Sequence, residues 1–126
     1  MSEHEGIIFP LYKEIVDRAV TGDKDVFAKF SNRRVEPGMT LYLYETGEDG
    51  SRKIVAEAEV QESEKLKPNE VEERFEDRLF QTAEEFEEYT SGRRDKEMLV
   101  LVLDKVEKLS EPRDASGNIT VAGLYV

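Results

Sequence analysis

Met39-Thr40-Leu41-Tyr42-Leu43-Tyr44-Glu45 is the stretch of this 126-residue chain that decides its fold class. Its leucines alternate with its tyrosines, which is the period of a β-strand with one buried face. The Pro37-Gly38 pair in front of it favours a turn. After a Gly-rich turn at residues 47–50, residues 52–60 alternate in the same way. The two segments together predict a β-hairpin.

The chain before the hairpin predicts a helix and a strand. Apolar residues recur at helical spacing from about Leu11 to Ala19, and Gly22 follows as a left-handed cap. Residues 25–30 are typical of a strand with two different faces. In front of the helix we expect a flexible tail, residues 1–6.

The chain after the hairpin predicts helices and two more strands. Residues 68–88 are helical in pattern, with Asn69 as an N-cap and with Thr82 and Glu85 spaced as a capping box. Residues 98–103 are entirely apolar, which indicates a strand buried on both faces. Residues 119–126 predict a last strand, in which Gly123 marks a bulge or a close approach.

These elements predict one α+β domain over residues 7–126, with a small curled mixed sheet or barrel. The length fits a single domain, and no linker, repeat or low-complexity segment divides the chain. No apolar run approaches the roughly 18 residues that span a bilayer, and no signal peptide is evident. We therefore expect a small, soluble, cytoplasmic protein without a membrane partner.

The residues that are missing exclude several classes of site. The chain has no Cys and one His, His4, in the expected tail. Disulfides, thiolate nucleophiles, multi-His metal sites and Ser-His-Asp triads are therefore excluded. Glycine-rich phosphate loops are absent too. We expect neither a metal nor a cofactor, and binding is at least as well supported as catalysis.

The net charge of −11 is unevenly distributed. Residues 57–88 hold 13 acidic and 4 basic side chains, a net charge of −9, whereas residues 18–34 hold 5 basic and 2 acidic ones, a net charge of +3. The acidic segment predicts a solvated helix face, or alternatively acidic helices that meet a basic protein partner. The basic segment allows a small or single-stranded nucleic-acid ligand on an acidic protein.

Several short motifs follow one another along the chain. They are Gly22-x-Lys24, Pro37-Gly38-Met39, Val55-Ala56-Glu57-Ala58, Met98-Leu99-Val100-Leu101 with Lys105-Val106, and Ala122-Gly123-Leu124-Tyr125. In this order they resemble the ASCH branch of the PUA-like superfamily, and they look most like a small archaeal family of unknown function within it. The resemblance spans roughly residues 7–126.

The resemblance implies a PUA-like pseudobarrel with flanking helices, and a cleft walled by the first helix and the neighbouring strands. Members of the superfamily bind RNA or modified nucleotides, and some ASCH proteins hydrolyse the acyl amide of acetylated cytidine. Those enzymes use a Lys, a Thr three residues later and a Glu from a later strand. Lys24 matches the Lys, and Glu57 or Glu59 matches the Glu, but Phe27 stands where the Thr belongs. This departure argues against carrying the hydrolase activity over.

The candidate binding residues each have a functional and a structural interpretation. Lys24, Lys29, Arg33 and Arg34 could hold phosphate, or could keep their charged ends in water along an apolar stem. Tyr42 and Tyr44 share a strand face and could stack on bases or simply pack. Arg93, with its neighbour Arg94, either caps the preceding helix or lies at the cleft mouth. Glu57 and Glu59 form either an acid–base pair or ordinary surface.

We therefore expect a domain that binds RNA or a nucleotide in a cleft bordered by Lys24, Lys29, Arg33 and Tyr44. The first alternative is an amidohydrolase in which Lys24 activates water and Glu57 or Glu59 acts as acid or base. The second is an interaction module that uses the acidic segment.

Overall fold

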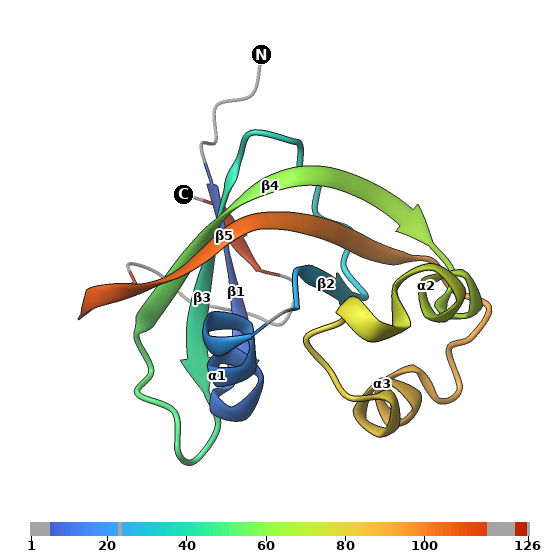
Figure 1. Cartoon of the computed structure of the whole chain (residues 1–126), viewed down its shortest axis with the longest axis horizontal. Coiled ribbons are helices and arrows are strands. Elements are labelled where there is room, and N and C mark those ends of the chain that lie inside the picture. Colours follow the sequence, from blue (N-terminus) through green and yellow to red (C-terminus); the bar gives the residue numbers. More distant parts are fainter. Residues whose placement is uncertain (1–5, 23, 116–122, 126) are drawn as a thin grey trace.

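The computed structural model describes residues 6–22, 24–115 and 123–125 (Figure 1). These residues form a mixed α+β fold, as predicted. The elements are, in chain order, β1 (Gly6–Tyr12), α1 (Lys13–Thr21), β2 (Val26–Lys29), β3 (Thr40–Thr46), β4 (Ile54–Leu66), α2 (Pro68–Phe75), a 3-10 turn η1 (Glu76–Arg78), α3 (Ala83–Thr90), β5 (Met98–Arg113) and β6 (Leu124–Tyr125).

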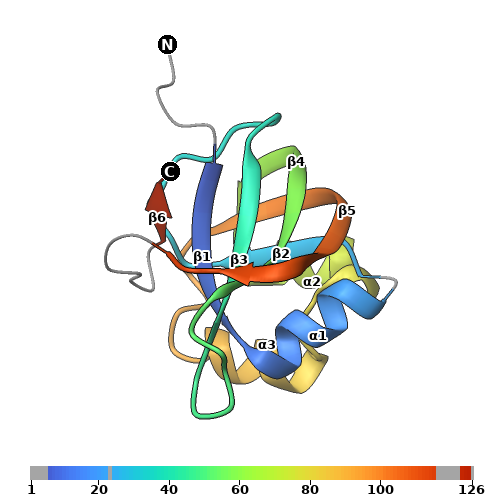
Figure 2. The same cartoon turned by 90° about the vertical axis from the view of Figure 1, so that its left-hand side faces the viewer.

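The described strands form one sheet in the order β2-β5-β4-β3-β1-β6. β1 and β3 run parallel, and the other neighbours are antiparallel. The pairing of β4 with β5 shifts register at three places, and such bulges bend a strand. Figure 2 shows the resulting curl, in which β5 and β2 run crosswise to β1 and β3. The sheet is therefore barrel-like, as the sequence predicts.

The curl divides the core into two parts that share β5. Leu99, Leu101 and Leu103 face the larger core inside the curled sheet. The residues between them, with Met98, face a smaller core that α2 and α3 cover. The predicted burial of both faces of residues 98–103 is thus confirmed. One face of this strand is covered inside the curled sheet and the other by α2 and α3, so neither face is exposed to solvent.

The predicted N-terminal helix is wrong at both ends. Residues 6–12, which include Leu11, belong to strand β1, so that helix α1 begins at Lys13. Pro10 is tolerated in the strand, and β1 pairs in parallel with β3, which is distant in sequence. Gly22 has φ −122°, so it is not a left-handed cap. Of the expected tail, Gly6 begins β1, and the rest, with His4, lies outside the described residues.

The later elements follow the prediction more closely. The capping box of Thr82 and Glu85 is confirmed, with both hydrogen bonds formed at 2.9 and 3.1 Å. Asn69 is not an N-cap, because α2 begins one residue earlier at Pro68, whose missing N–H suits a first helical position. None of the described helices has the length and apolar character needed to cross a membrane.

The last predicted strand, residues 119–126, is described only at residues 123–125, and its remainder lies outside the described residues. Leu124–Tyr125 form β6 beside β1. Gly123 has φ +92°, and a Cβ there would lie 2.7 Å from the Phe9 ring. The predicted close approach at Gly123 is confirmed.

Candidate functional site

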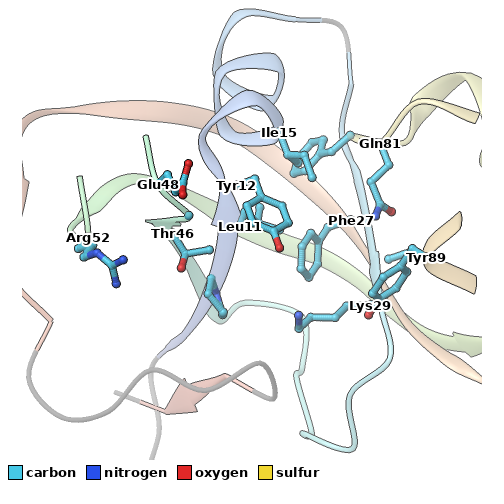
Figure 3. A pocket seen from close by; sticks show the side chains of 14 residues that line it. Leu11, Tyr12, Ile15, Phe27, Lys29, Thr46, Glu48, Arg52, Gln81 and Tyr89 are labelled. Atoms are coloured by element: carbon cyan, nitrogen blue, oxygen red, sulfur yellow. The ribbon is translucent and has the colours of Figure 1, made fainter. Parts of the chain in front are cut away.

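A cavity of about 610 Å³ opens where β1 ends and α1 begins (Figure 3). Its walls come from β1, the first turn of α1, β2, the β3–β4 turn, residues 80–81 and α3. The register of β1 against β3 pairs Tyr12 with Thr46, which brings the start of α1 beside the β3–β4 turn. The cavity is therefore a product of the parallel β1–β3 pairing.

Apolar side chains form much of the cavity wall. Leu11, Ile15, Phe27 and Phe80 all line it. The ring of Phe27 lies 5.3 Å from that of Phe9, measured between centroids, and 6.3 Å from that of Phe80. Such a wall can accept a planar apolar group by burying its surface.

Arg18 of α1 fixes the wall that contains Phe80. It donates from Nη1 to the Phe80 carbonyl at 2.9 Å and makes two bonds to the Glu85 carboxylate at 2.7 and 2.8 Å. The Arg18 guanidinium holds the pKa of Glu85 below its usual value, and the Thr82 N–H and hydroxyl add to this effect. One arginine thus ties α1 to the segment between η1 and α3.

Lys29 of β2 is a cation inside the cavity. It extends past the Phe27 ring, and its nitrogen points into the cavity and away from Tyr89 (Figure 3). The ammonium lies 5.8 Å from the centroid of the Phe9 ring. Within the described part of the chain it makes no hydrogen bond or ion pair. Burial, together with the positive charge of Arg93, lowers the pKa of Lys29.

Arg52 supplies a second cation, from the β3–β4 turn. Its φ of +59° is uncommon for a residue other than glycine. Glu45 holds this backbone, since its carbonyl accepts from the Arg52 N–H and its carboxylate accepts from the Ser51 N–H. The guanidinium of Arg52 forms no ion pair with any described residue. Figure 3 shows it on the far side of the cavity from Lys29.

Tyrosines and an amide complete the polar lining. Tyr12, at the start of α1, is 61% exposed and lies between Arg52 and Phe27 (Figure 3). The Tyr89 hydroxyl accepts from the Phe30 N–H at 2.9 Å, and burial raises the pKa of Tyr89. Gln81 lines the wall near Tyr89. The cavity therefore offers hydrogen-bonding groups beside apolar surface.

The structure does not bring the predicted cleft residues together. Of Lys24, Lys29, Arg33 and Tyr44, only Lys29 lines the cavity. Lys24 donates from Nζ to the Asp77 carbonyl at 2.5 Å. The Arg33 guanidinium lies over the Tyr125 ring, with 5.4 Å from its central carbon to the ring centroid.

The other predicted cations and aromatic residues make local contacts. The backbone N–H of Arg34 donates to the Tyr125 hydroxyl at 2.7 Å. Tyr42 and Tyr44 share the partly exposed face of β3, and Arg113 lies over the Tyr42 ring. Arg93 donates to the carbonyl of Tyr89, so the predicted capping of the preceding helix is confirmed for this residue.

Arg94 has a structural position between two helices. It donates to the Thr90 hydroxyl of α3 and to Asn69 and Glu72 of α2. It therefore neither lines the large cavity nor lies free at its mouth.

Glu57 and Glu59 lie at a different place on the sheet. Together with Asp104 and Glu107 they line a second cavity of about 260 Å³, which shares no lining residue with the first. Lys24 lines neither of these two cavities, so neither of them holds the predicted hydrolytic set of Lys24 with Glu57 or Glu59. In the described ranges, no cluster of three or more carboxylates or histidines is placed to hold a metal ion.

The acidic segment, residues 57–88, is partly neutralised by arginines, of which Arg74 lies in the segment and Arg18 and Arg94 lie outside it. Glu64 pairs with Arg74, Glu72 with Arg94, and Glu85 with Arg18. Residues 57–66 of this segment lie in strand β4 rather than in a helix. The segment is thus a mixture of ion pairs and exposed carboxylates on several elements.

Phe27 links the sequence prediction to the cavity. It occupies the position at which the resemblance expects a nucleophilic Thr, and its ring does line the cavity. Arg52, Tyr12, Gln81 and Tyr89 were not among the predicted site residues. No spacing in the sequence points to Arg52 or Tyr12, because their proximity depends on the β1–β3 pairing.

A curled mixed sheet with a cavity beside its first helix places the protein in a known structural class. The ASCH protein of Zymomonas mobilis has the same fold, with a TM-score of 0.80 over 97% of this chain and 87% of that chain, at 13% identity. Two variants of that protein match with TM-scores of 0.82 and 0.76, at 12% and 14% identity, over 97% and 90% of this chain and 90% and 77% of theirs. The predicted ASCH/PUA-like fold is confirmed.

The family follows from the sequence itself. The model of the family described as "Domain of unknown function (DUF365)" matches residues 4–126, and the chain belongs to that family. A search of curated proteins finds no match.

Proposed function

We propose that this domain binds a nucleotide, either free or as one unit of a single-stranded RNA, in the cavity beside α1. The observation that carries the proposal is the pair of cations, Lys29 and Arg52, on the cavity wall. Neither forms an ion pair with a described residue, although the protein has a net charge of −11. Lys29 is half-buried and Arg52 is exposed at the cavity. Because a cation that is withdrawn from water is normally paired, the negative charge that Lys29 lacks is assigned to the ligand, and Arg52 is free to approach the same anion.

The other lining residues support a base-sized group next to that charge. A nucleobase would lie against Phe27 and Tyr12, because base–aromatic contacts are typically worth about 1–3 kcal/mol each. A phosphate would lie between Lys29 and Arg52, which can donate charge-assisted hydrogen bonds. The cavity of about 610 Å³ is within the usual range for small-molecule sites. The resemblance to PUA-like proteins, whose members bind RNA or modified nucleotides, supports the same choice.

The geometry gives less support to the two alternative functions, hydrolysis of a modified nucleoside and binding of a basic protein partner. Hydrolysis of a modified nucleoside would need a nucleophile at position 27, where the cavity wall is a phenyl ring. A basic protein partner would compete with the arginines that already pair with Glu64, Glu72 and Glu85. Incubation with acetylated cytidine, followed by chromatography, tests the first of these alternatives.

Binding titrations test the proposal. Nucleoside monophosphates and a short single-stranded RNA are titrated into the protein at low and moderate salt. We expect affinity to fall with salt and to fall further in Lys29→Ala and Arg52→Ala. The matched control is Lys24→Ala, which removes one positive charge outside the cavity. Equal weakening in all three variants, or no binding in the wild type, would refute the proposed site.

A further inference from the structure

Lys29 differs chemically from the other lysines whose contacts the structure gives. Lys13 pairs with Asp17 at 2.9 Å, Lys53 with Asp114 at 3.7 Å, and Lys24 and Lys65 donate to backbone carbonyls. Among the described residues, Lys29 makes no hydrogen bond or ion pair, and its nitrogen lies 5.8 Å from the centroid of the Phe9 ring. It also points into a cavity large enough for a second molecule.

The groups around Lys29 make its proton easier to remove than that of an ordinary lysine, because burial and the charge of Arg93 lower its pKa. Arg93 is the nearby charge, and it is held by the Tyr89 carbonyl and lies over the Phe30 ring, 4.3 Å from the centroid. Glu48 and Arg52 lie across the cavity, which Tyr12 and Tyr89 also line. Among these groups no carboxylate makes an ion pair with Lys29. A lysine in apolar surroundings beside another cation is a known arrangement for an amine nucleophile.

We propose that the ε-amine of Lys29 is a reactive amine, which captures the carbonyl carbon of a small aldehyde or ketone that carries an anionic group. Arg52, on the far side of the cavity, holds the anionic group. This activity goes beyond nucleotide binding and does not depend on it.

The chemical step needs no further reactant. The lone pair of the neutral amine attacks the carbonyl carbon, and the C=O π electrons move to oxygen, giving a carbinolamine after proton transfer from nitrogen. The carbinolamine oxygen then takes up a second proton and leaves as water, while the nitrogen forms the C=N bond and its remaining proton is released. One imine and one water form from one amine and one carbonyl compound.

The apolar wall supports this step. Phe27 and Phe80 limit access of water to the carbon–nitrogen bond, which disfavours hydrolysis of the imine. Lys29 lies on β2, which is held on one edge by β5 and bridged on the other at Leu79, so its position is set by the sheet. A nucleophile on a strand is placed more exactly than one on a loop.

Borohydride trapping with pyridoxal 5′-phosphate tests the proposal on the whole protein. The phosphorylated aldehyde is added at a substoichiometric amount near neutral pH, the imine is reduced, and the labelled lysines are identified by peptide mapping. We expect Lys29 to carry most of the label, and the total label to be largely lost in Lys29→Arg, which keeps the charge. Lys13 and Lys24 serve as internal controls in the same digest.

Two results would overturn the assignment. Label spread evenly over the surface lysines, with Lys29 no more labelled than Lys13, would show that Lys29 is an ordinary amine. For Arg52, the comparison is between pyridoxal phosphate and pyridoxal, which lacks the phosphate. Arg52→Gln should lower labelling by the first reagent only, and an equal effect on both would remove Arg52 from the proposal. Circular dichroism of each variant confirms that the fold is kept.

Discussion

Phe9 of β1 and Phe27 of β2 are in ring contact, with centroids 5.3 Å apart, although β5, β4 and β3 lie between their strands in the sheet. The contact closes the curl of the sheet across its interior. Because Phe27 also lines the cavity, this one residue takes part both in closing the fold and in building the site. Changes in this contact should therefore affect both stability and binding.

The first prediction concerns Phe9, whose side chain is 0% exposed. Replacing it by Ala should lower the free energy of unfolding by about 3–5 kcal/mol, because a large cavity replaces a ring that touches Phe27. Phe9→Leu keeps most of the apolar volume and should lose clearly less. Chemical denaturation followed by circular dichroism measures both. Equal losses for the two variants would contradict this prediction, because they would show that the loss comes from the missing ring itself and not from the apolar volume that is removed.

The second prediction separates backbone strain from close approach. Gly123 and Gly38 have similar positive φ angles, +92° and +97°, but a Cβ at Gly38 would meet nothing within 4 Å. Gly38→Ala should therefore lower the free energy of unfolding by about 1–2 kcal/mol, which is the penalty for placing a residue with a Cβ at a positive φ. Gly123→Ala should cost more, because its Cβ would lie 2.7 Å from the Phe9 ring. Thermal unfolding of both variants gives the comparison, and a smaller loss at Gly123 would contradict it.

Local patterns in the sequence were sufficient for the elements whose partners are close in the chain. The alternation of residues 39–45 and 52–60 predicted the β3–β4 hairpin, and the apolar run at 98–103 predicted a strand buried on both faces. Strand β1 was missed because it pairs with a strand that is distant in the sequence: Gly6 pairs with Thr40 of β3, 34 residues later in the chain. Nothing in residues 6–12 alone distinguishes a strand containing Pro10 from the lead-in to a helix.

The site divides in the same way. Lys29 could be predicted, because a charged residue in an apolar strand is a local anomaly. Arg52 and Tyr12 could not be predicted, because only the β1–β3 register, which pairs Tyr12 with Thr46, brings them to the same cavity. Lys24 was chosen for its charge and for its match to the Lys of the ASCH pattern, and Arg33 for its charge. The structure gives each a neighbour outside the cavity.

The third prediction concerns the Arg18–Glu85 pair, which is about a third exposed at 32% and 37%. Arg18→Ala should cost about 1–2 kcal/mol, since it removes a paired carboxylate contact and the bond to the Phe80 carbonyl, in partly solvated surroundings. Lys13→Ala, which breaks an exposed pair on the same helix, should change stability little. Urea denaturation of both variants tests this, and equal effects would contradict it.

The same pair predicts a pH dependence. The folded-state pKa of Glu85 lies below its ordinary value of 4.5, so the stabilisation is present above pH 4.5 and is lost as the pH falls through the folded value. The stability difference between the wild type and Arg18→Ala should therefore shrink on acidification in that window. A difference that stays constant would show that Arg18 acts only through the Phe80 carbonyl.

The last prediction is that the protein is less stable for having Lys29. Lys29→Met keeps an unbranched side chain against the Phe9 ring and removes the desolvated charge, so its melting temperature near neutral pH should be higher than that of the wild type.

The folded-state pKa of Lys29 lies below its ordinary value of 10.5. Between the folded-state pKa and the ordinary pKa of Lys29, the unfolded chain binds more protons than the folded protein. The stability of the wild type therefore rises with pH in this range, and the difference in stability between Lys29→Met and the wild type becomes smaller. Lys24→Met, which changes a lysine outside the cavity, should give no such gain. A lower melting temperature for Lys29→Met, or a difference in stability that does not change with pH, would contradict the prediction. Either result would mean that the folded protein itself compensates the charge of Lys29, so that no ligand is needed to do so.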